Sequence, residues 1–294
     1  MQLLFALTLA VVAISTAAVL FRLAPDVPPL TAAGDRLVLA GLVLLAVVGP
    51  RRVARVPRGR GLGAGLAYAV HFGAWVASLG LTSVAASVTA VTTSPILLAA
   101  WGLATRRDAP SARTLAALAL AVVGVAWLAT TSGAERPAHL LGLALGLLGA
   151  VAIAVYFLLA RRGGPTLDAL AFSCVATLSG GVALLVTAAA LGEPLVPGSA
   201  ADAWLVVGAA ALPQLVGHTL MTWALRQATP TTVALATLGE PAGASFLAAL
   251  VLHEPLSTAA ALACLVTLVG VAIAASRPDG GASTSAEDPA TLPP

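Results

Sequence analysis

The chain contains no lysine, and charged residues of every kind make up only 9% of its 294 residues. Without lysine there is no G-x-x-x-x-G-K-[ST] loop to hold the phosphates of ATP, so an ATP-driven motor of that type is excluded. Hydrophobic residues account for 59% of the chain, which leaves too little polar surface to solvate a globule of this size. We therefore expect a protein that lies within a lipid bilayer.

Several motifs of catalysis and metal binding are also missing from the sequence. There is no G-x-S-x-G element, no H-E-x-x-H element and no cluster of histidine, cysteine and carboxylate residues at metal-binding spacing. The only two cysteines, Cys174 and Cys264, lie in apolar runs, where a thiol is most simply a small hydrophobic side chain. We expect no disulfide, no metal site, no cofactor and no enzymatic activity, and we expect the energy for function to come from a gradient.

Ten apolar stretches fill the chain from Leu3 to about Ser276. A hydrocarbon core about 30 Å thick needs roughly 20 helical residues, and each stretch has about this length. The runs are continuously apolar and lack the alternation of barrel strands, which favours helices. The predicted fold is an all-α polytopic membrane protein with ten transmembrane helices, at residues 3–21, 29–49, 61–81, 83–104, 111–131, 138–160, 167–190, 201–224, 229–252 and 256–276.

The basic residues, all of them arginine, are distributed unevenly among the connections between these helices. If both termini face the cytoplasm, the cytoplasmic segments hold twelve of the fifteen arginines, and only Arg22 and Arg136 lie on the opposite side. Cationic residues are retained in cytoplasmic loops, so we predict a multi-pass protein of the cytoplasmic (plasma) membrane with both termini cytoplasmic. Topology also explains the basic segment 51–60, with contact to lipid headgroups as a by-product, and we expect no nucleic-acid partner.

The chain contains an internal repeat of five helices. A shift of 146 positions aligns Pro95 with Pro241, and one further residue of shift aligns His71 with His218. Because five is an odd number, the second copy must enter the membrane from the opposite side. We therefore predict two inverted five-helix repeats, an architecture typical of secondary transporters.

The sequence ATLGEPAGASFLAALVLHEPLS at 236–257 resembles the ninth helix of the drug/metabolite transporter superfamily, EamA type. That pattern has a glutamate-proline pair within the helix and an acidic residue before a leucine where the next helix starts. The resemblance implies a small-molecule carrier, in many members an exporter, with EamA-like repeats at 1–131 and 138–276. Residues 277–294 are rich in small, proline and acidic residues, and we predict a disordered cytoplasmic tail there.

Glu240 lies near the middle of its predicted span. There the insertion of a carboxylate costs a free energy of roughly 2.5–3.5 kcal/mol, so we expect either a compensating partner or a functional role. Proline removes a helix hydrogen-bond donor, so we predict helix kinks at Pro241 and at its counterpart Pro95. We interpret Glu240 as a substrate- or proton-binding acid; the alternative is a structural glutamate that is neutralised by Arg36 or held protonated by its neighbours. The Arg36 guanidinium suits a carboxylate-bearing substrate, although snorkelling to the membrane interface also explains it. Ser94 stands where the second half has Glu240, so two equivalent carboxylates are not expected.

Polar and aromatic side chains recur at helical spacing in the third and eighth predicted spans. Tyr68, His71 and Trp75 share one face of the third, and Gln214 and His218 share one face of the eighth. Such groups are unfavourable against lipid, so we predict that they line a water-accessible cavity together with Glu240 and Arg36. Hydrogen bonding between helices is the alternative.

These features together predict a secondary active transporter that moves a small metabolite, amino acid or drug-like compound across the cytoplasmic membrane, as an exporter coupled to protons. One alternative is a passive uniporter or exchanger of the same fold. A membrane-embedded enzyme or sensor is another, but cytoplasmic loops of about 3–10 residues leave little room for a catalytic or signalling domain. The expected partners are a small-molecule substrate, protons and the lipid bilayer, and the protein is a monomer or a homodimer.

Overall fold

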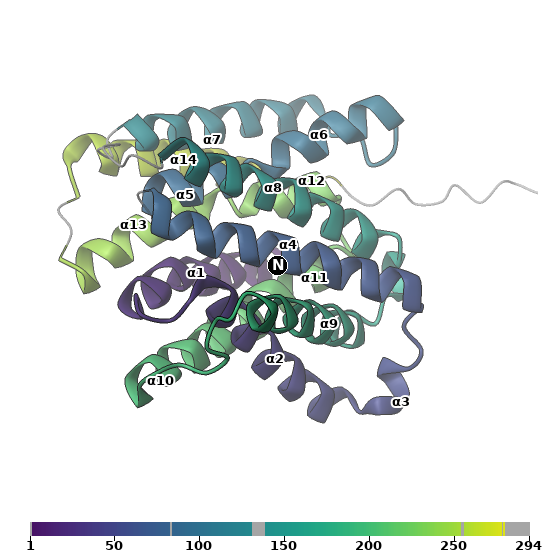
Figure 1. Cartoon of the computed structure of the whole chain (residues 1–294). Helices are drawn as coiled ribbons and strands as arrows, with labels where there is room; N and C mark the ends of the chain where they lie inside the picture. The colour runs from purple at the N-terminus through teal and green to yellow at the C-terminus, as the bar shows by residue number, and fades with distance from the viewer. Residues whose placement is uncertain (1, 83, 131–138, 254–255, 278, 280–294) are drawn as a thin grey trace, which may run out of the picture.

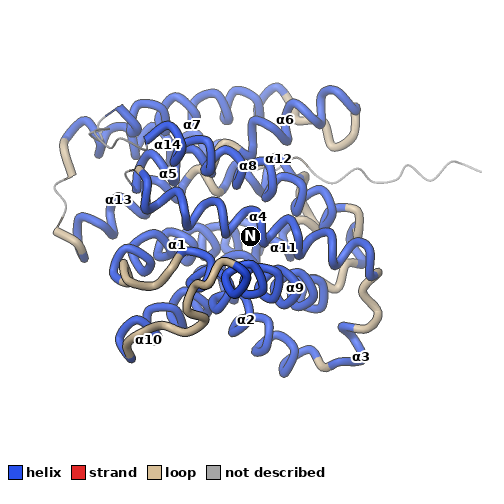
Figure 2. The backbone as a smooth tube through the Cα atoms, in the orientation of Figure 1, coloured by secondary structure: helices blue, strands red, loops and turns tan. Residues whose placement is uncertain are grey.

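The computed structural model describes residues 2–82, 84–130, 139–253, 256–277 and 279. Within these ranges the regular structure is helical throughout, with no strand (Figures 1 and 2). Ten helical segments are long and apolar enough to cross a membrane, and their bounds lie within a few residues of those expected from the sequence. The prediction of an all-α polytopic membrane protein with ten transmembrane helices is confirmed.

Seven of the ten spans are single α-helices. They are α1 (Gln2–Leu23), α2 (Pro29–Val48), α4 (Arg58–Leu81), α7 (Ala112–Thr130), α8 (His139–Arg161), α9 (Ala169–Ala190) and α14 (Thr258–Ser276). The short helix α3 (Pro50–Val53) and the 3-10 turn η1 (Gly164–Thr166) lie in the connections between spans. The other three spans, the fourth, eighth and ninth, are each made of more than one helical segment.

The fourth and ninth spans are each broken into two helices near the middle. The fourth consists of α5 (Val84–Val91) and α6 (Ser94–Thr105), and the ninth of α12 (Pro230–Ala236) and α13 (Gly239–Val251). The predicted kink prolines, Pro95 and Pro241, both lie in the first turn of the second helix. An N–H group there has no partner within its helix, so proline fits without strain and the chain breaks before it instead of bending.

Threonine hydroxyl groups at both breaks donate to carbonyl oxygens of the preceding helical turn, which also accept a backbone N–H. The Oγ1 atom of Thr92 donates to the carbonyl oxygen of Val88 at 2.8 Å, and that of Thr237 donates to the carbonyl oxygen of Ala234 at 2.6 Å. These hydrogen bonds satisfy the hydroxyl groups themselves, which would be costly as unpaired polar groups at membrane depth. The two threonine hydroxyl groups of TTSP at 92–95 are thus satisfied within their own helix.

The two halves of the chain pack through equivalent helices. The second span, α2, lies along the seventh, α9, and the fifth span, α7, lies along the tenth, α14. Likewise α4 packs on α8 in the same way as the eighth span packs on α1. Pairing of this kind is what a two-fold relation between the halves requires. The inverted orientation and the repeat boundaries 1–131 and 138–276 remain predictions.

The connections that carry most of the arginines gather at one end of the bundle, on the right in Figure 1, where α3, the end of α6 and the α8–α9 connection lie. A salt bridge of 2.8 Å joins Arg161 to Asp108, and Arg161 also donates to the carbonyl oxygen of Leu225 at 2.9 Å. Arg226 donates to the carbonyl oxygen of Pro165 at 2.9 Å. The uneven placement of arginine is therefore a property of the folded bundle, whereas the membrane face to which this end belongs stays a prediction.

A few positions used in the sequence argument lie outside the described residues. They include the connection 131–138 with Arg136, the acidic residue of the motif at Glu254, and the predicted disordered tail apart from Arg277 and Asp279. The backbone N–H of Ser111 donates to a carboxylate oxygen of Asp279 at 3.0 Å. The chain therefore returns to the arginine-bearing end after its last span.

Asp168 joins two connections at this end. Its carboxylate oxygens accept hydrogen bonds of 2.9 Å from Nε and NH2 of Arg52, and one of them also accepts from the backbone N–H of Ala171 at the start of α9. The hydrogen bonds from Arg52 are the main cause that lowers the pKa of Asp168 below its ordinary value. Both side chains are partly exposed, 47% for Arg52 and 38% for Asp168, so solvent screens the interaction.

Asp168→Asn is expected to lower the melting temperature by about 1–3 °C at pH 7, and by less as the pH falls. A lowered carboxyl pKa contributes stability above the unfolded value of about 3.9, and this contribution is lost as the pH falls through the folded value. Asparagine still caps α9, so only the ionic part is removed. Thermal unfolding between pH 7 and pH 3 measures this, with the exposed Asp26→Asn as control. A difference that grows towards pH 3 would contradict the assignment.

Candidate functional site

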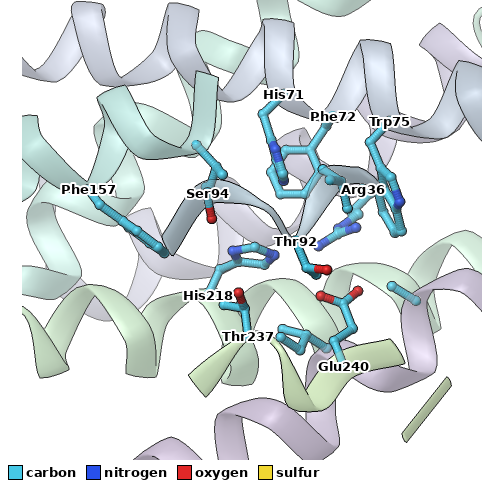
Figure 3. Close-up of a pocket in the computed structure, with 14 residues that line it drawn as sticks. Arg36, His71, Phe72, Trp75, Thr92, Ser94, Phe157, His218, Thr237 and Glu240 are labelled. Carbon is cyan, nitrogen blue, oxygen red and sulfur yellow. The ribbon is translucent and has the colours of Figure 1, made fainter. Parts of the chain in front are cut away.

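The breaks in the fourth and ninth spans meet at a small cavity between the two halves of the chain (Figure 3). Seven of the ten spans contribute to its wall, namely α1, α2, α4, α8 and the fourth, eighth and ninth spans. The residues that line it are Ile14, Ala17, Arg36, His71, Phe72, Trp75, Val91, Thr92, Ser94, Ile153, Phe157, His218, Thr237 and Glu240.

 The cavity has a volume of about 30 Å³, room for one or two water molecules, whereas a pocket for a metabolite usually needs about 300 Å³ or more. The structure therefore has the site in a closed arrangement.

Arg36 is completely buried at this cavity. Its NH2 group donates to Oε1 of Gln214 at 3.1 Å, and its guanidinium carbon lies 4.3 Å from the centre of the Phe72 ring. The Nε and NH1 atoms have no hydrogen-bond partner among the residues that the structure describes. Arg36 thus does not snorkel to the end of the bundle here, and it keeps two donor groups available inside the membrane.

Glu240 lies in the first turn of α13 and is only 9% exposed. In Figure 3 its carboxylate points towards Thr92 and towards the guanidinium of Arg36 on the far side of the cavity. No salt bridge between described residues joins Glu240 to Arg36. The two opposite charges therefore face each other across a water-poor space, where their attraction is stronger than in bulk water but leaves both groups open to other partners.

His71 and His218, aligned by the internal repeat, lie close together, with ring centres 6.2 Å apart. The Nδ1 atom of His71 lies 2.8 Å from the carbonyl oxygen of Gly149, so this nitrogen must carry the proton, because a carbonyl group only accepts. The Nδ1 atom of His218 and the indole N–H of Trp75 have no hydrogen-bond partner among the described residues. The cavity wall therefore presents both donors and acceptors.

Two of the predicted site residues, Tyr68 and Gln214, lie behind the wall instead of lining the cavity. Tyr68 is fully buried, stacks on Tyr156 with ring centres 3.9 Å apart and meets His218 edge-on at 5.9 Å. Gln214 holds Arg36 through the hydrogen bond already described. The other five predicted residues line the cavity, namely Glu240, Arg36, His71, Trp75 and His218.

The shape of the eighth span decides where Gln214 and His218 lie. This span begins as α10 (Ala200–Ala209), widens into a π-helix (Ala210–His218) and ends as α11 (Thr219–Ala224). Pro213 lies inside the π-helix and has no N–H to donate, which disturbs α-helical pairing. π-Helical turns are rare and frequent at functional sites. The sequence argument assumed a regular α-helix here and did not foresee this widening.

Several wall residues were not predicted as site residues. Ser94 and Thr237 lie at the breaks, and Ser94 occupies the position that the repeat aligns with Glu240. A search along the repeat for the partner of Glu240 finds Ser94, and the same shift aligns Thr237 with Val91, also in the wall. Phe72 packs its ring on Arg36 but carries no signal in the sequence, since an apolar residue in an apolar span stands out only when its neighbours are known.

Ten membrane-crossing helices in two halves, with broken helices that meet at a charged central cavity, define a polytopic membrane protein with the construction of transporters. The chain belongs to the EamA-like transporter family, whose model matches residues 1–130 and 140–276. The predicted family resemblance is thereby confirmed. Membership in this family indicates a membrane transporter of small molecules.

Comparison with solved structures shows the same fold elsewhere. A crystal structure of a protein that is 17% identical in sequence superposes with a TM-score of 0.78, over 93% of this chain and 96% of the other. At this level of identity the likeness shows the fold alone. The comparison with curated proteins gave no match.

Proposed function

We propose that this protein is a secondary active transporter that exports a small metabolite, amino acid or drug-like compound across the cytoplasmic membrane in exchange for protons. The observation that carries the proposal is the pair of buried opposite charges, Arg36 and Glu240, which face each other in a closed cavity between the two halves. A buried charge that forms no salt bridge costs free energy. Two buried charged side chains that face each other without forming a salt bridge therefore favour a functional role. Family membership favours a carrier over an enzyme or a sensor.

The two charges suit a substrate with one anionic and one cationic group. Arg36 has unpaired Nε and NH1 groups, and a guanidinium fork binds a carboxylate through two parallel hydrogen bonds. Glu240 offers a carboxylate for an amine. Phe72, Trp75 and Phe157 supply aromatic surface for the apolar part of such a molecule. A zwitterionic amino acid or a related metabolite is therefore the substrate class we favour.

Competition for Glu240 supplies the exchange mechanism. A proton and the cationic group of the substrate cannot both neutralise the same carboxylate, because a neutral carboxyl group no longer attracts an amine. Substrate release towards one side would therefore accompany protonation of Glu240 from that side. The cavity of about 30 Å³ has to open on one face at a time, and relative rocking of two inverted halves provides this motion.

The test measures efflux from liposomes that contain the purified protein and a mixed pool of amino acids, nucleosides and cationic dyes, with mass spectrometry as the readout. We expect selective loss of one compound class, accelerated by an imposed pH gradient. Selective loss that is indifferent to the gradient would favour a passive uniporter or exchanger. If no compound in the panel were lost selectively, the enzyme or sensor alternative would gain weight.

Glu240→Gln is expected to remove the response to the pH gradient, because an amide cannot release or take up a proton at this site. Efflux from liposomes with and without the gradient should then be equal within error. The exposed Asp26→Asn serves as the matched control and should keep the wild-type ratio. A Glu240→Gln protein that folds, transports and still responds to the gradient would place the coupling group elsewhere.

A further inference from the structure

A second hollow lies at the arginine-bearing end of the bundle, between the α3–α4 connection and the α8–α9 connection. Its volume is about 330 Å³, which is large enough for a small organic anion. Arg52, Arg55, Arg60 and Asp168 contribute the charges of its wall, and apolar residues such as Leu167 complete it. The hollow shares no residue with the central cavity.

The wall of this hollow carries an excess of positive charge. Arg52 is committed to Asp168 through two hydrogen bonds of 2.9 Å, and each neutralises the other. The guanidinium groups of Arg55 and Arg60 form no salt bridge or hydrogen bond with the rest of the described chain. Two positively charged residues therefore line the hollow without a partner among the residues that the structure describes. Elsewhere at this end, Arg161 and Arg226 are held by acceptors of the chain itself.

The depth of the hollow indicates which anions reach it. The spans α4 and α9 begin at Arg58 and Ala169, so the hollow lies at the level where helices leave the hydrocarbon core. Exposed leucines, Leu62 and Leu170, follow within the first turns of these helices and start the lipid-facing surface. An anion at this level has lipid headgroups as its nearest source.

We propose that the hollow binds the phosphodiester headgroup of an anionic membrane lipid between Arg55 and Arg60. Guanidinium groups bind phosphate oxygens through charge-assisted, often bidentate hydrogen bonds. The salt bridge between Arg52 and Asp168 fixes the two connections that form the hollow, so the site is formed before the lipid arrives. Retention of arginine on the cytoplasmic side explains the number of charges in these loops but requires no concave site.

The experiment uses delipidated full-length protein in detergent, titrated with phosphatidylglycerol, phosphatidylcholine or inorganic phosphate. Native mass spectrometry reads bound lipid, and thermal unfolding reads stabilisation. The double variant Arg55→Gln/Arg60→Gln is compared with Arg106→Gln/Arg107→Gln, which removes the same charge from two exposed arginines outside the hollow. We expect the first variant to bind phosphatidylglycerol roughly 10- to 30-fold more weakly, since each arginine near an anionic surface contributes about fivefold.

Each outcome decides the proposal. Phosphatidylglycerol that binds wild type and the Arg106→Gln/Arg107→Gln control alike but binds Arg55→Gln/Arg60→Gln more weakly, with phosphatidylcholine much weaker throughout, supports the lipid site. Undiminished binding of phosphatidylglycerol by Arg55→Gln/Arg60→Gln would overturn it. Equal weakening in both double variants would overturn it, because the effect would then follow net charge alone. Equal stabilisation by inorganic phosphate at the same concentration would also overturn the lipid assignment and leave a site for a soluble anion. Transport is not needed for any of these readouts.

Discussion

Arg36→Gln is expected to lower transport roughly 10- to 150-fold, because a hydrogen bond to a charged group contributes about 1.5–3 kcal/mol. The guanidinium of Arg36 is fully buried at the central cavity and keeps its Nε and NH1 groups unpaired within the described chain. Glutamine removes the positive charge and the fork that would hold a carboxylate. The measurement is initial efflux of the substrate found in the liposome panel.

The same change is expected to leave the melting temperature equal to that of the wild type or higher. A buried cation without a salt bridge is costly, and its removal recovers that cost, while Glu240 can take up a proton and so is not left as an unpaired buried charge. The loss of the contact with the Phe72 ring, about 0.5–2 kcal/mol, acts in the opposite direction. If Arg36→Gln lowers transport but not the melting temperature, Arg36 has a binding role, because replacement of a purely structural arginine would lower both transport and the melting temperature.

Two further variants accompany Arg36→Gln, one to test the shape of the guanidinium group and one as a control. Arg36→Lys keeps the charge but not the planar fork, so we expect partial transport with a raised substrate concentration at half-maximal rate. Arg58→Gln removes an exposed arginine at the start of α4 and should transport at the wild-type rate. Wild-type transport by Arg36→Gln would contradict the proposed substrate site.

Gly124→Ala is expected to destabilise the protein by about 1–3 kcal/mol through overpacking, which lowers the melting temperature by roughly 3–10 °C. A Cβ atom at Gly124 of α7 would lie 2.5 Å from the backbone nitrogen of Thr267 and 2.8 Å from the carbonyl oxygen of Ala263, both on α14. Backbone atoms cannot turn aside as a flexible side chain can, so the two helices would have to separate.

The repeat supplies a second version of this experiment. Gly270 is aligned with Gly124 by the shift of 146 residues, and a Cβ atom there would lie 2.7 Å from the backbone nitrogen of Ala121. Gly270→Ala should therefore cost about as much as Gly124→Ala. The control is Gly59→Ala, where no atom lies within 4 Å of the added carbon. This change should be neutral or slightly stabilising, since alanine favours the helix over glycine. Equal stability of all three variants would contradict the close approach of α7 and α14.

Much of the fold followed from composition and length, because the thickness of a bilayer sets how long an apolar helix must be. The second span was expected at 29–49 and is observed at Pro29–Val48, and the eighth was expected at 201–224 and lies at Ala200–Ala224. The family could be predicted from the motif around Glu240, because such a motif consists of residues that follow one another in the sequence.

The site was predictable where a polar residue in an apolar span stood out. Glu240, Arg36, His71 and His218 were found in this way, since a polar group in hydrocarbon needs a reason to be there. The internal repeat added the pairing of His71 with His218, whose rings do lie close together.

The sequence by itself determined that this chain crosses a membrane ten times, belongs to a transporter family and buries a small set of polar residues. Only the tertiary structure decided that Arg36 faces the centre, that the eighth span widens at Pro213, and that Phe72 rather than a carboxylate contacts the guanidinium. Polar residues such as His71 mark the cavity side of a helix where they occur, but an apolar wall residue such as Phe72 cannot be told from a lipid-facing one by its place along the helix. The packing of the surrounding helices makes that choice, and it also closes the site to a volume of about 30 Å³.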